Sequence, residues 1–189
     1  MSRIFFEENF IGEDLTSESI KNGDYELCTF TNCNFSNGDL SGINFIDCIF
    51  DSCDLSLINV ADAGLKNVKF KNCKLLGVHF ERCSLFSLEF TFEECILNLS
   101  SFFKLKLKNI VFKDCQLKET DFAEANLTSA LFDNCDLTGA IFDHTTLEKA
   151  DFRTAYNYSI HPADNKIKKA KFSANGIRGL LDKYSIIIE

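Results

Sequence analysis

Residues 119–142 read ETDFAEANLTSALFDNCDLTGAIF, and a large apolar residue stands at every fifth position of this stretch. The series is Phe122, Leu127, Phe132, Leu137 and Phe142. Two places before each of them stands a small residue, and the residue between is usually polar. A period of five fits neither the 3.6-residue period of a helix nor the two-residue period of a strand. The sequence therefore predicts a different repeating unit.

The same period runs through most of the chain. From Phe10 to Leu85 every fifth residue is large and apolar, and the frame then slips by two residues. It resumes at Phe92 and continues to Phe152. We interpret the two extra residues, which fall within 86–91, as a small bulge in one wall of the structure.

A period of five makes sense if each pentapeptide forms one side of a square coil. Residues two apart share a face of an extended chain, so the large residue and the small residue before it both point inward. Four sides give a coil of 20 residues, and residues 20 apart should stack on both sides of the slip. Two columns have this spacing: Phe30, Phe50, Phe70, Phe92, Phe112, Phe132 and Phe152, and Cys33, Cys53, Cys73, Cys95, Cys115 and Cys135.

The pattern of a small residue, Asp or Asn, Leu or Phe and two polar residues resembles the pentapeptide repeat family over about residues 22–152. This resemblance implies an all-β fold, a right-handed quadrilateral β-helix of about eight coils. Each buried Leu or Phe contributes roughly 1.5–3 kcal/mol. The expected organisation is a lead-in or cap over 1–20, the β-helix over 21–155, a loop with a last partial coil over 156–172, and a terminal segment over 173–189.

The first twenty residues keep the frame of large residues but place Glu8, Glu13 and Glu18 at the small inward position. Burying these carboxylates would be costly. A solenoid also exposes an open edge at each end, and such edges invite aggregation. We therefore expect an irregular lead-in or cap here.

The C-terminal segment breaks the repeat at residues 156–169, which contain the only proline, Pro162. Ser173 is suited to cap a short α-helix, and the following apolar residues have the spacing of a helical stripe. Residues 185–189 look like a terminal strand. The segment either only caps the solenoid or also forms a two-fold dimer interface. The residues assigned to it are Ile177, Leu180, Leu181, Tyr184, Ile186 and Ile188.

The Cys column is best explained as small buried side chains, because its members follow one wall and lack the paired spacing of zinc sites. The three His residues, His79, His144 and His161, are scattered. No catalytic constellation or phosphate-binding glycine loop is recognisable. We expect no metal, no cofactor and no catalytic residue, and hence a binding protein rather than an enzyme.

The net charge is −8, so the basic footprint of direct nucleic-acid binding is missing. The opening MSRIFFEENF lacks the features of a signal peptide, and no apolar run reaches the length of a membrane span. We expect a cytoplasmic protein whose nine Cys residues are free thiols.

The charge is unevenly distributed along the chain. Residues 1–60 carry a net charge of −9, residues 61–113 carry +4, residues 114–151 carry −7, and residues 152–189 carry +4. None of the nine acids in 114–151 falls at an inward position. This surface is either a solvated, solubilising one or an electronegative track that imitates the phosphates of DNA. The residues assigned to the track are Asp114, Glu119, Asp121, Asp133, Asp136, Asp143 and Asp151.

Within the family, the chain is similar to the Qnr-type quinolone-resistance proteins in its single solenoid, its acidic surface and its terminal GIRGLLDKYSIIIE, residues 176–189. This resemblance implies a homodimeric rod, joined at the C-terminal ends, that mimics duplex DNA and binds DNA gyrase or topoisomerase IV. The larger projecting loops of some members are missing, and the lysine-rich belt within 61–113 interrupts a uniform mimic. The alternative is an interaction scaffold or immunity factor with another protein partner.

Overall fold

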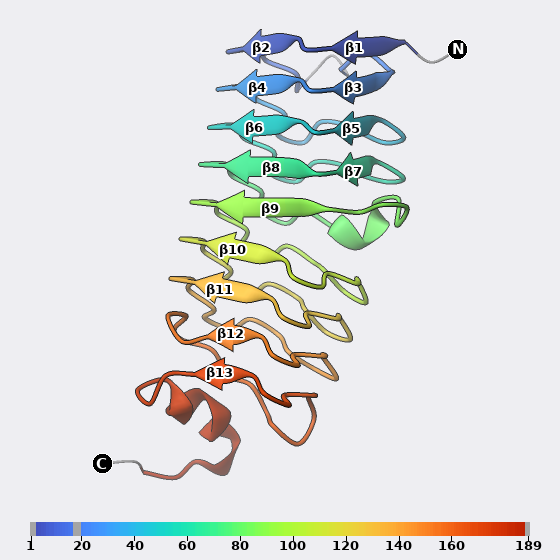
Figure 1. Ribbon diagram of the computed structural model, residues 1–189. Helices are drawn as coiled ribbons and strands as arrows, with labels where there is room; N and C mark the ends of the chain where they lie inside the picture. The colour runs from blue at the N-terminus through green and yellow to red at the C-terminus, as the bar shows by residue number, and fades with distance from the viewer. Residues whose placement is uncertain (1–2, 17–19, 188–189) are drawn as a thin grey trace.

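In the computed structural model, which describes residues 3–16 and 20–187, the chain is a rod of stacked coils (Figure 1). Each coil passes along four walls, which we number 1 to 4 in chain order from the wall that carries Phe10. The strands are β1 (Ile4–Phe6), β2 (Asn9–Ile11), β3 (Asp24–Glu26), β4 (Thr29–Thr31), β5 (Asn44–Ile46), β6 (Ile49–Asp51), β7 (Gly64–Lys66), β8 (Val68–Lys71), β9 (Phe90–Glu93), β10 (Val111–Lys113), β11 (Leu131–Asp133), β12 (Asp151–Phe152) and β13 (Lys171–Phe172). Three short 3-10 helices are η1 (Phe80–Arg82), η2 (Ile177–Leu180) and η3 (Asp182–Tyr184).

The coils are joined by parallel pairing on every wall. Wall 1 is a nine-stranded sheet that runs from β2 to β13, whereas the strands of wall 4 form a four-stranded sheet, β1-β3-β5-β7. Walls 2 and 3 are joined by isolated parallel bridges, such as Asn34 with Asp54 on wall 2. Because each coil pairs only with its neighbours, the contacts are those of a linear repeat protein.

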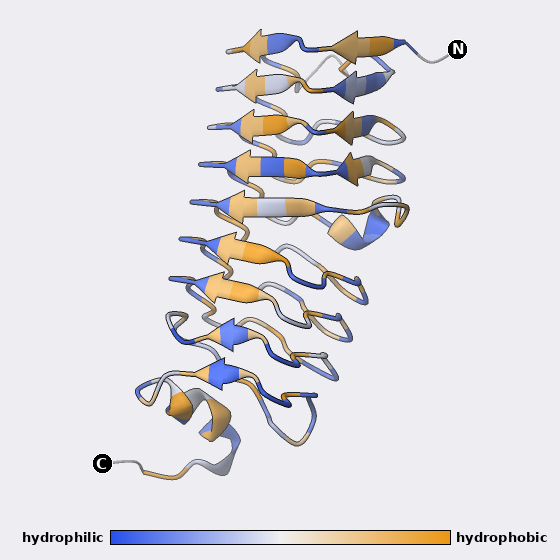
Figure 2. Ribbon diagram, in the orientation of Figure 1, coloured by the Kyte–Doolittle hydropathy of each residue, from blue (hydrophilic) through white to orange (hydrophobic). Residues whose placement is uncertain are grey.

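The core confirms the predicted inward columns. The side chains of Phe50, Phe70 and Phe112 are 1%, 3% and 0% exposed. Along wall 1, successive Phe rings lie parallel with centroids 4.6 to 5.4 Å apart. A second column on wall 3 runs from Phe80 to Phe142 and meets the first at steep ring angles. Figure 2 shows the apolar residues recurring at the same place in successive strands of wall 1.

The corners between walls are made by residues with left-handed backbone. Asn32, Ser52 and Asn72 follow one another at the corner of walls 1 and 2, with φ values of 53°, 57° and 50°. Asn and Asp tolerate this conformation better than other residues that carry a Cβ. Polar residues of the repeat therefore allow the chain to turn at the corners, although they lie outside the core.

The slip in the repeat forms a loop that projects from wall 4. The amide of Ser84 still bonds the carbonyl oxygen of Ala63 in the original register, while Val68 already pairs with Phe90, 22 residues later. The two extra residues thus lie within 85–88, which overlaps the predicted range of 86–91. The interpretation of Leu85 as inward-facing is wrong, because its side chain is 71% exposed.

The expectation of an irregular segment over 1–20 is wrong for the described residues 3–16. Strands β1 and β2 pair with β3 and β4 in the ordinary register of 20 residues. Glu8 and Glu13 occupy inward columns but are exposed, and β1 and β2 form the outermost of the described coils (Figure 1). Their carboxylates therefore remain hydrated. In the same coil, the Phe5 ring stacks on the Tyr25 ring at a centroid distance of 4.5 Å.

The C-terminal segment differs from the prediction in two ways. Residues 156–172 form most of a coil rather than a loop that replaces one, since Tyr156, Lys166 and Phe172 all pair with residues 20 places earlier. The expected α-helix is replaced by η2 and η3, and residues 185–187 are not a strand. The Ser173 hydroxyl accepts a hydrogen bond of 3.1 Å from the Gly176 amide, but the N-cap of η2 is Gly176, so Ser173 does not cap a helix as expected. None of the helices in residues 3–16 and 20–187 is long and apolar enough to cross a membrane.

Candidate interaction surfaces

The seven predicted track acids share the C-terminal half of the rod but not one face of it. Asp133 and Asp151 belong to strands of wall 1, and Asp136 bridges neighbouring coils on wall 2. Asp121 and Asp143 lie on wall 3, whereas Asp114 and Glu119 are left-handed corner residues. The structure therefore spreads the acidic charge around three sides of the rod.

One of these acids, Asp136, is tied into the rod. It is only 8% exposed. Its carboxylate lies 3.3 Å from the Lys118 ammonium and accepts hydrogen bonds of 2.6 Å from the Thr138 hydroxyl and 3.0 Å from the Asn157 amide. Burial alone would raise the pKa of Asp136, but these hydrogen bonds outweigh it and hold the pKa below its usual value. Asp136 is therefore a structural residue.

Asp151 is also neutralised within the chain. Its carboxylate lies 2.8 Å from the Arg153 guanidinium and 3.5 Å from the Lys171 ammonium. The Arg153 hydrogen bond is the main reason why the pKa of Asp151 falls below its usual value. A cationic partner would have to displace these two side chains to reach this carboxylate.

The other five track acids have no Lys or Arg ion pair within the described part of the chain. Three of them accept hydrogen bonds from neutral donors instead: Asp114 from the Asn134 amide at 2.7 Å, Asp121 from the Ala123 backbone at 2.8 Å and Asp133 from the Thr154 hydroxyl at 2.9 Å. These contacts hold the carboxylates in place and leave their charge uncompensated.

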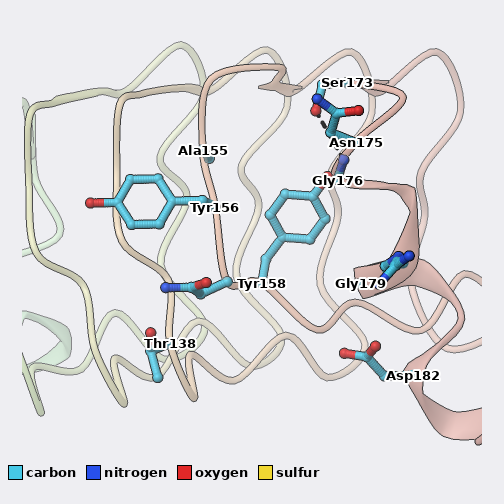
Figure 3. A pocket seen from close by; sticks show the side chains of 11 residues that line it. Thr138, Ala155, Tyr156, Tyr158, Ser173, Asn175, Gly176, Gly179 and Asp182 are labelled. Atoms are coloured by element: carbon cyan, nitrogen blue, oxygen red, sulfur yellow. Dashed lines mark hydrogen bonds between the residues drawn. The ribbon is translucent and has the colours of Figure 1, made fainter.

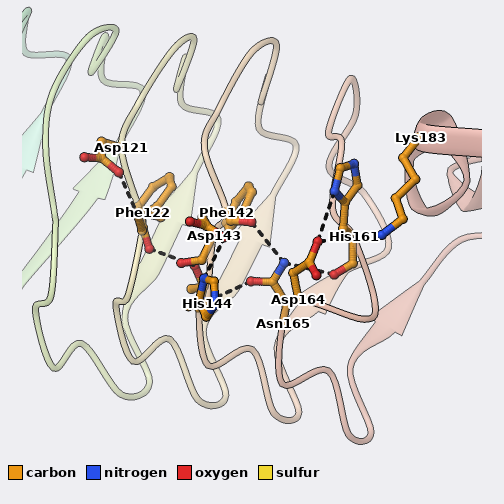
Figure 4. Close-up of polar contacts among 11 residues, drawn as sticks. Asp121, Phe122, Phe142, Asp143, His144, His161, Asp164, Asn165 and Lys183 are labelled. Carbon is orange, nitrogen blue, oxygen red and sulfur yellow. Dashed lines mark hydrogen bonds and ion pairs between the residues drawn. The ribbon is translucent and has the colours of Figure 1, made fainter.

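Figure 4 shows polar contacts that attach the last coil where walls 3 and 4 meet. The Asp143 carboxylate contacts the His144 ring at 2.7 Å on the outside. Inside, the buried Asn165 side chain donates to the carbonyl oxygen of Phe142 at 2.9 Å and accepts from the Thr145 amide at 2.8 Å. Sequence reasoning missed this pair, although Thr145 and Asn165 are 20 residues apart at the small inward position.

The Cys column fills the interior of wall 2. All nine Cys residues are buried and free, and most thiols of the column donate to the carbonyl oxygen of a Phe in the preceding coil, as Cys53 does to Phe30 at 3.3 Å. Burial raises the pKa of the Cys48 and Cys83 thiols to about 12. Among the described residues, no three His, Cys, Asp or Glu side chains converge as a metal site would require.

The C-terminal cap closes the end of the rod beside a hollow of about 710 Å³ (Figure 3). The Tyr158 ring points toward Gly176, and its hydroxyl is buried without a hydrogen-bond partner in the described part of the chain. Gly176 and Gly179 pack so closely on Tyr158 that any side chain at either position would collide with it. This close approach explains why glycines interrupt the expected apolar stripe.

The apolar residues of the cap are only partly covered. Leu180 packs against the core and Leu181 is half-buried. Ile177, Tyr184 and Ile186 are 48%, 56% and 56% exposed, while Ile188 lies outside the described residues. The cap thus leaves an apolar surface at the end of the rod.

Continuous parallel walls around an interior filled with side chains define a β-solenoid protein. Residues 24–91 and 89–157 match the family model of the pentapeptide repeat region. The chain therefore belongs to the pentapeptide repeat family, as the sequence resemblance implied.

Solved structures agree on the fold. A trypsin-treated variant of QnrB1, described as a plasmid-mediated fluoroquinolone resistance protein, is 19% identical over the whole of both chains, with a TM-score of 0.58. Full-length QnrB1 is 18% identical over 97% of this chain and all of its own, with a TM-score of 0.51. HetL, a pentapeptide repeat protein involved in heterocyst differentiation regulation in Nostoc sp. strain PCC 7120, is 15% identical over 90% of this chain and 86% of its own, with a TM-score of 0.53. No curated protein matches the chain in sequence.

Proposed function

We propose that the protein is a non-enzymatic binding protein whose acidic surface mimics duplex DNA and engages a DNA-binding protein, with DNA gyrase or topoisomerase IV as the candidate partner. The observation that carries this proposal is the set of exposed or half-buried acids that have no Lys or Arg partner within the described part of the C-terminal half of the rod. The resemblance to Qnr-type proteins supports the choice of partner, and the fluoroquinolone resistance in the description of QnrB1 points the same way.

The spread of the acids over three walls is compatible with such a role. Duplex DNA presents phosphates around its circumference, and a saddle-shaped protein groove contacts several sides of it at once. Asp114, Asp121, Asp133 and Asp143 would satisfy the Lys and Arg side chains of such a groove. Binding of this kind is electrostatic and weakens as salt is added.

The exposed apolar surface of the cap supports the second part of the proposal, a homodimer joined at the C-terminal ends. Ile177, Tyr184 and Ile186 would be covered in a two-fold contact. A dimer of this form would double the length of the acidic rod and place the acids of residues 114–151 on both sides of the two-fold axis.

A supercoiling assay with purified gyrase, with and without a quinolone, tests the partner. We expect inhibition or quinolone protection by the wild-type protein, and the loss of both when Asp114, Asp121, Asp133 and Asp143 are changed to Lys. Asp136 is left unchanged because it is structural. A matched control reverses four acids of the N-terminal half, Glu7, Glu8, Glu13 and Asp62, and should keep activity. No effect of the wild-type protein at micromolar concentration would end the proposal for gyrase.

Light scattering at several concentrations tests the dimer separately. We expect twice the mass of one chain for the wild type and a single-chain mass for a Tyr184→Glu, Ile186→Glu variant. A wild-type protein that is monomeric at high concentration would remove the dimeric rod.

A second candidate function is an interaction scaffold or immunity factor with a different protein partner. It is favoured by the mixed charge of wall 1, where Glu93 and Lys113 form an ion pair of 2.5 Å beside the acidic region. Gyrase assays that show neither inhibition nor protection, together with a specific partner recovered at low salt, would favour this role.

A further inference from the structure

The loop over residues 85–88 makes the largest break in the regular surface of the rod. The side chains of Leu85 and Phe86 are 71% and 86% exposed. Leu88 and Phe90 enter the core in their place: Leu88 is partly buried against it, and Phe90 is 4% exposed. The loop therefore holds two large apolar side chains in water, and nothing in the packing of the core requires the Phe86 ring to be aromatic.

Two hollows flank this loop on the outer surface of wall 4. The first, of about 240 Å³, lies over strands β3, β5 and β7 and includes the Phe86 ring, Asn44 and Gly64 in its lining. The Asn44 side chain packs directly on Gly64, where a Cβ would collide with its amide oxygen. The second hollow, of about 450 Å³, lies on the other side of the loop. Lys66 and Ser87 line both, so the two hollows meet at the loop.

Three lysines from the coils on either side of the loop line the second hollow: Lys66, Lys106 and Lys108. All three are exposed, and none forms an ion pair with a carboxylate in residues 3–16 and 20–187. One carboxylate, that of Glu89, lines the same hollow without pairing with them. Asp24 lines the first hollow. The two hollows together therefore hold three lysines and two carboxylates, and they combine a net positive charge with an exposed aromatic ring on a protein whose net charge is −8.

We propose that this surface, the wall-4 dock, binds a short acidic polypeptide segment that carries a bulky apolar side chain. The apolar side chain would pack against Phe86 and Leu85, and the acidic residues would lie against the three lysines. Such a contact buries apolar area and pairs charge at once. It is independent of the acidic surface on walls 1 to 3, and it calls for a partner of the opposite charge.

A nucleic acid fits the wall-4 dock less well than a peptide. Toward the N-terminus, wall 4 carries the acids Asp24 and Glu26 in strand β3 and Asp47 at the following corner. A long polyanion lying along wall 4 would meet these carboxylates, whereas a short segment contacts the dock alone. A single-stranded oligonucleotide, which could stack a base on Phe86, is therefore the contrast to test.

A selection from a random peptide library displayed on phage, with the full-length protein immobilised, provides the test. We expect the selected peptides to be enriched in Asp or Glu and to share a Phe, Leu or Ile. Binding of the synthetic peptides, measured by fluorescence anisotropy, should weaken about tenfold or more when Lys66, Lys106 and Lys108 are changed to Glu. The Phe86→Ser variant should weaken it about tenfold.

Matched controls keep the result specific. Changing Lys166, Lys168 and Lys169 to Glu makes the same charge change farther along the rod, and Leu57→Ser removes another exposed apolar side chain; both should leave binding within about twofold. Circular dichroism checks that each variant is folded. The proposal is wrong if no acidic consensus emerges, if binding ignores the three lysines, or if an oligonucleotide binds through them and the acidic peptides do not.

Discussion

Walls 1 and 4 are built from the same repeat, yet only wall 1 passes through the slip unbroken. On wall 1, Phe70 stacks on Phe92 at a centroid distance of 5.2 Å across the two extra residues. On wall 4, the sheet ends at β7 and the chain leaves the wall as a loop. The difference indicates that the aromatic column fixes the register of the coils. Displacing a stacked Phe ring from the core would expose more apolar area than displacing a single Leu side chain. The insertion is therefore expelled where the inward residue is Leu85.

The largest expected effect tests this difference directly. Phe112 is fully buried, between Phe92 at 5.4 Å and Phe132 at 5.2 Å. Phe112→Ala should lower the free energy of unfolding by about 3–5 kcal/mol, through lost burial and a cavity. Leu85→Ala should change it by no more than about 0.5 kcal/mol. Urea unfolding followed by circular dichroism measures both. Equal losses at the two positions would contradict the distinction between the walls.

Removing the insertion should repair wall 4. Leu85 stands seven residues before Phe92. If Ser87 and Leu88 are deleted, the separation becomes five residues, which places Leu85 at the inward position of the repeat. Burial of Leu85 should outweigh the loss of the partly buried Leu88, so we expect a gain of about 1–2 kcal/mol. Thermal unfolding checks the gain. The deletion should also abolish peptide binding at the wall-4 dock, and a clear loss of stability would show that the loop is needed by the fold.

The outer charges of the two walls differ as well. On wall 1, Asp151 pairs with Arg153 and Lys171, whereas the lysines of the wall-4 dock are unpaired. Asp151→Asn should cost about 1 kcal/mol at pH 7, and Lys106→Gln should cost nothing measurable. Because the pKa of Asp151 is lower in the folded state than its ordinary value of 3.8, its contribution is present above that value and is lost as the pH falls through the folded pKa. The variant and the wild type should therefore converge at low pH.

Much of this fold is predictable because each inward residue is repeated many times. The periods of five and 20 residues are enough to predict that Phe50, Phe70 and Phe112 point inward and stack. The same periods reveal the slip. The count cannot decide which of Leu85 and Leu88 turns inward, since both are apolar and both lie in the loop over residues 85–88. In the structure Leu88 packs against the core, whereas Leu85 is 71% exposed.

The ends and the surface are harder for a different reason. A carboxylate at an inward position, such as Glu8, destabilises the fold only where another coil covers it. The repeat pattern does not show which coils are covered. At the C-terminal end the expected α-helix is replaced by two 3-10 helices, and Gly179 packs closely on Tyr158 there. The count in fives puts all the track acids outside the core positions, yet Asp136 is only 8% exposed whereas Asp114 and Asp143 are exposed. Counting them in twenties from Phe112 would also have shown that Asp133 and Asp136 lie on different walls.

The smallest expected effect concerns local opening beside the loop rather than global stability. Cys83 lies on wall 4 next to the break, whereas Cys48 lies on the unbroken wall 1, and they are 4% and 0% exposed. Burial raises the pKa of both thiols to about 12, so neither reacts at neutral pH until the wall opens around it. Wall 4 has fewer strand contacts near Cys83 and should open with a lower free energy.

Alkylation by iodoacetamide, followed by mass spectrometry of peptides, should label Cys83 well before Cys48. Deletion of Ser87 and Leu88 should slow the labelling of Cys83 and leave that of Cys48 unchanged. Equal labelling rates before the deletion would mean that the two walls open together and that the break in wall 4 has no dynamic consequence.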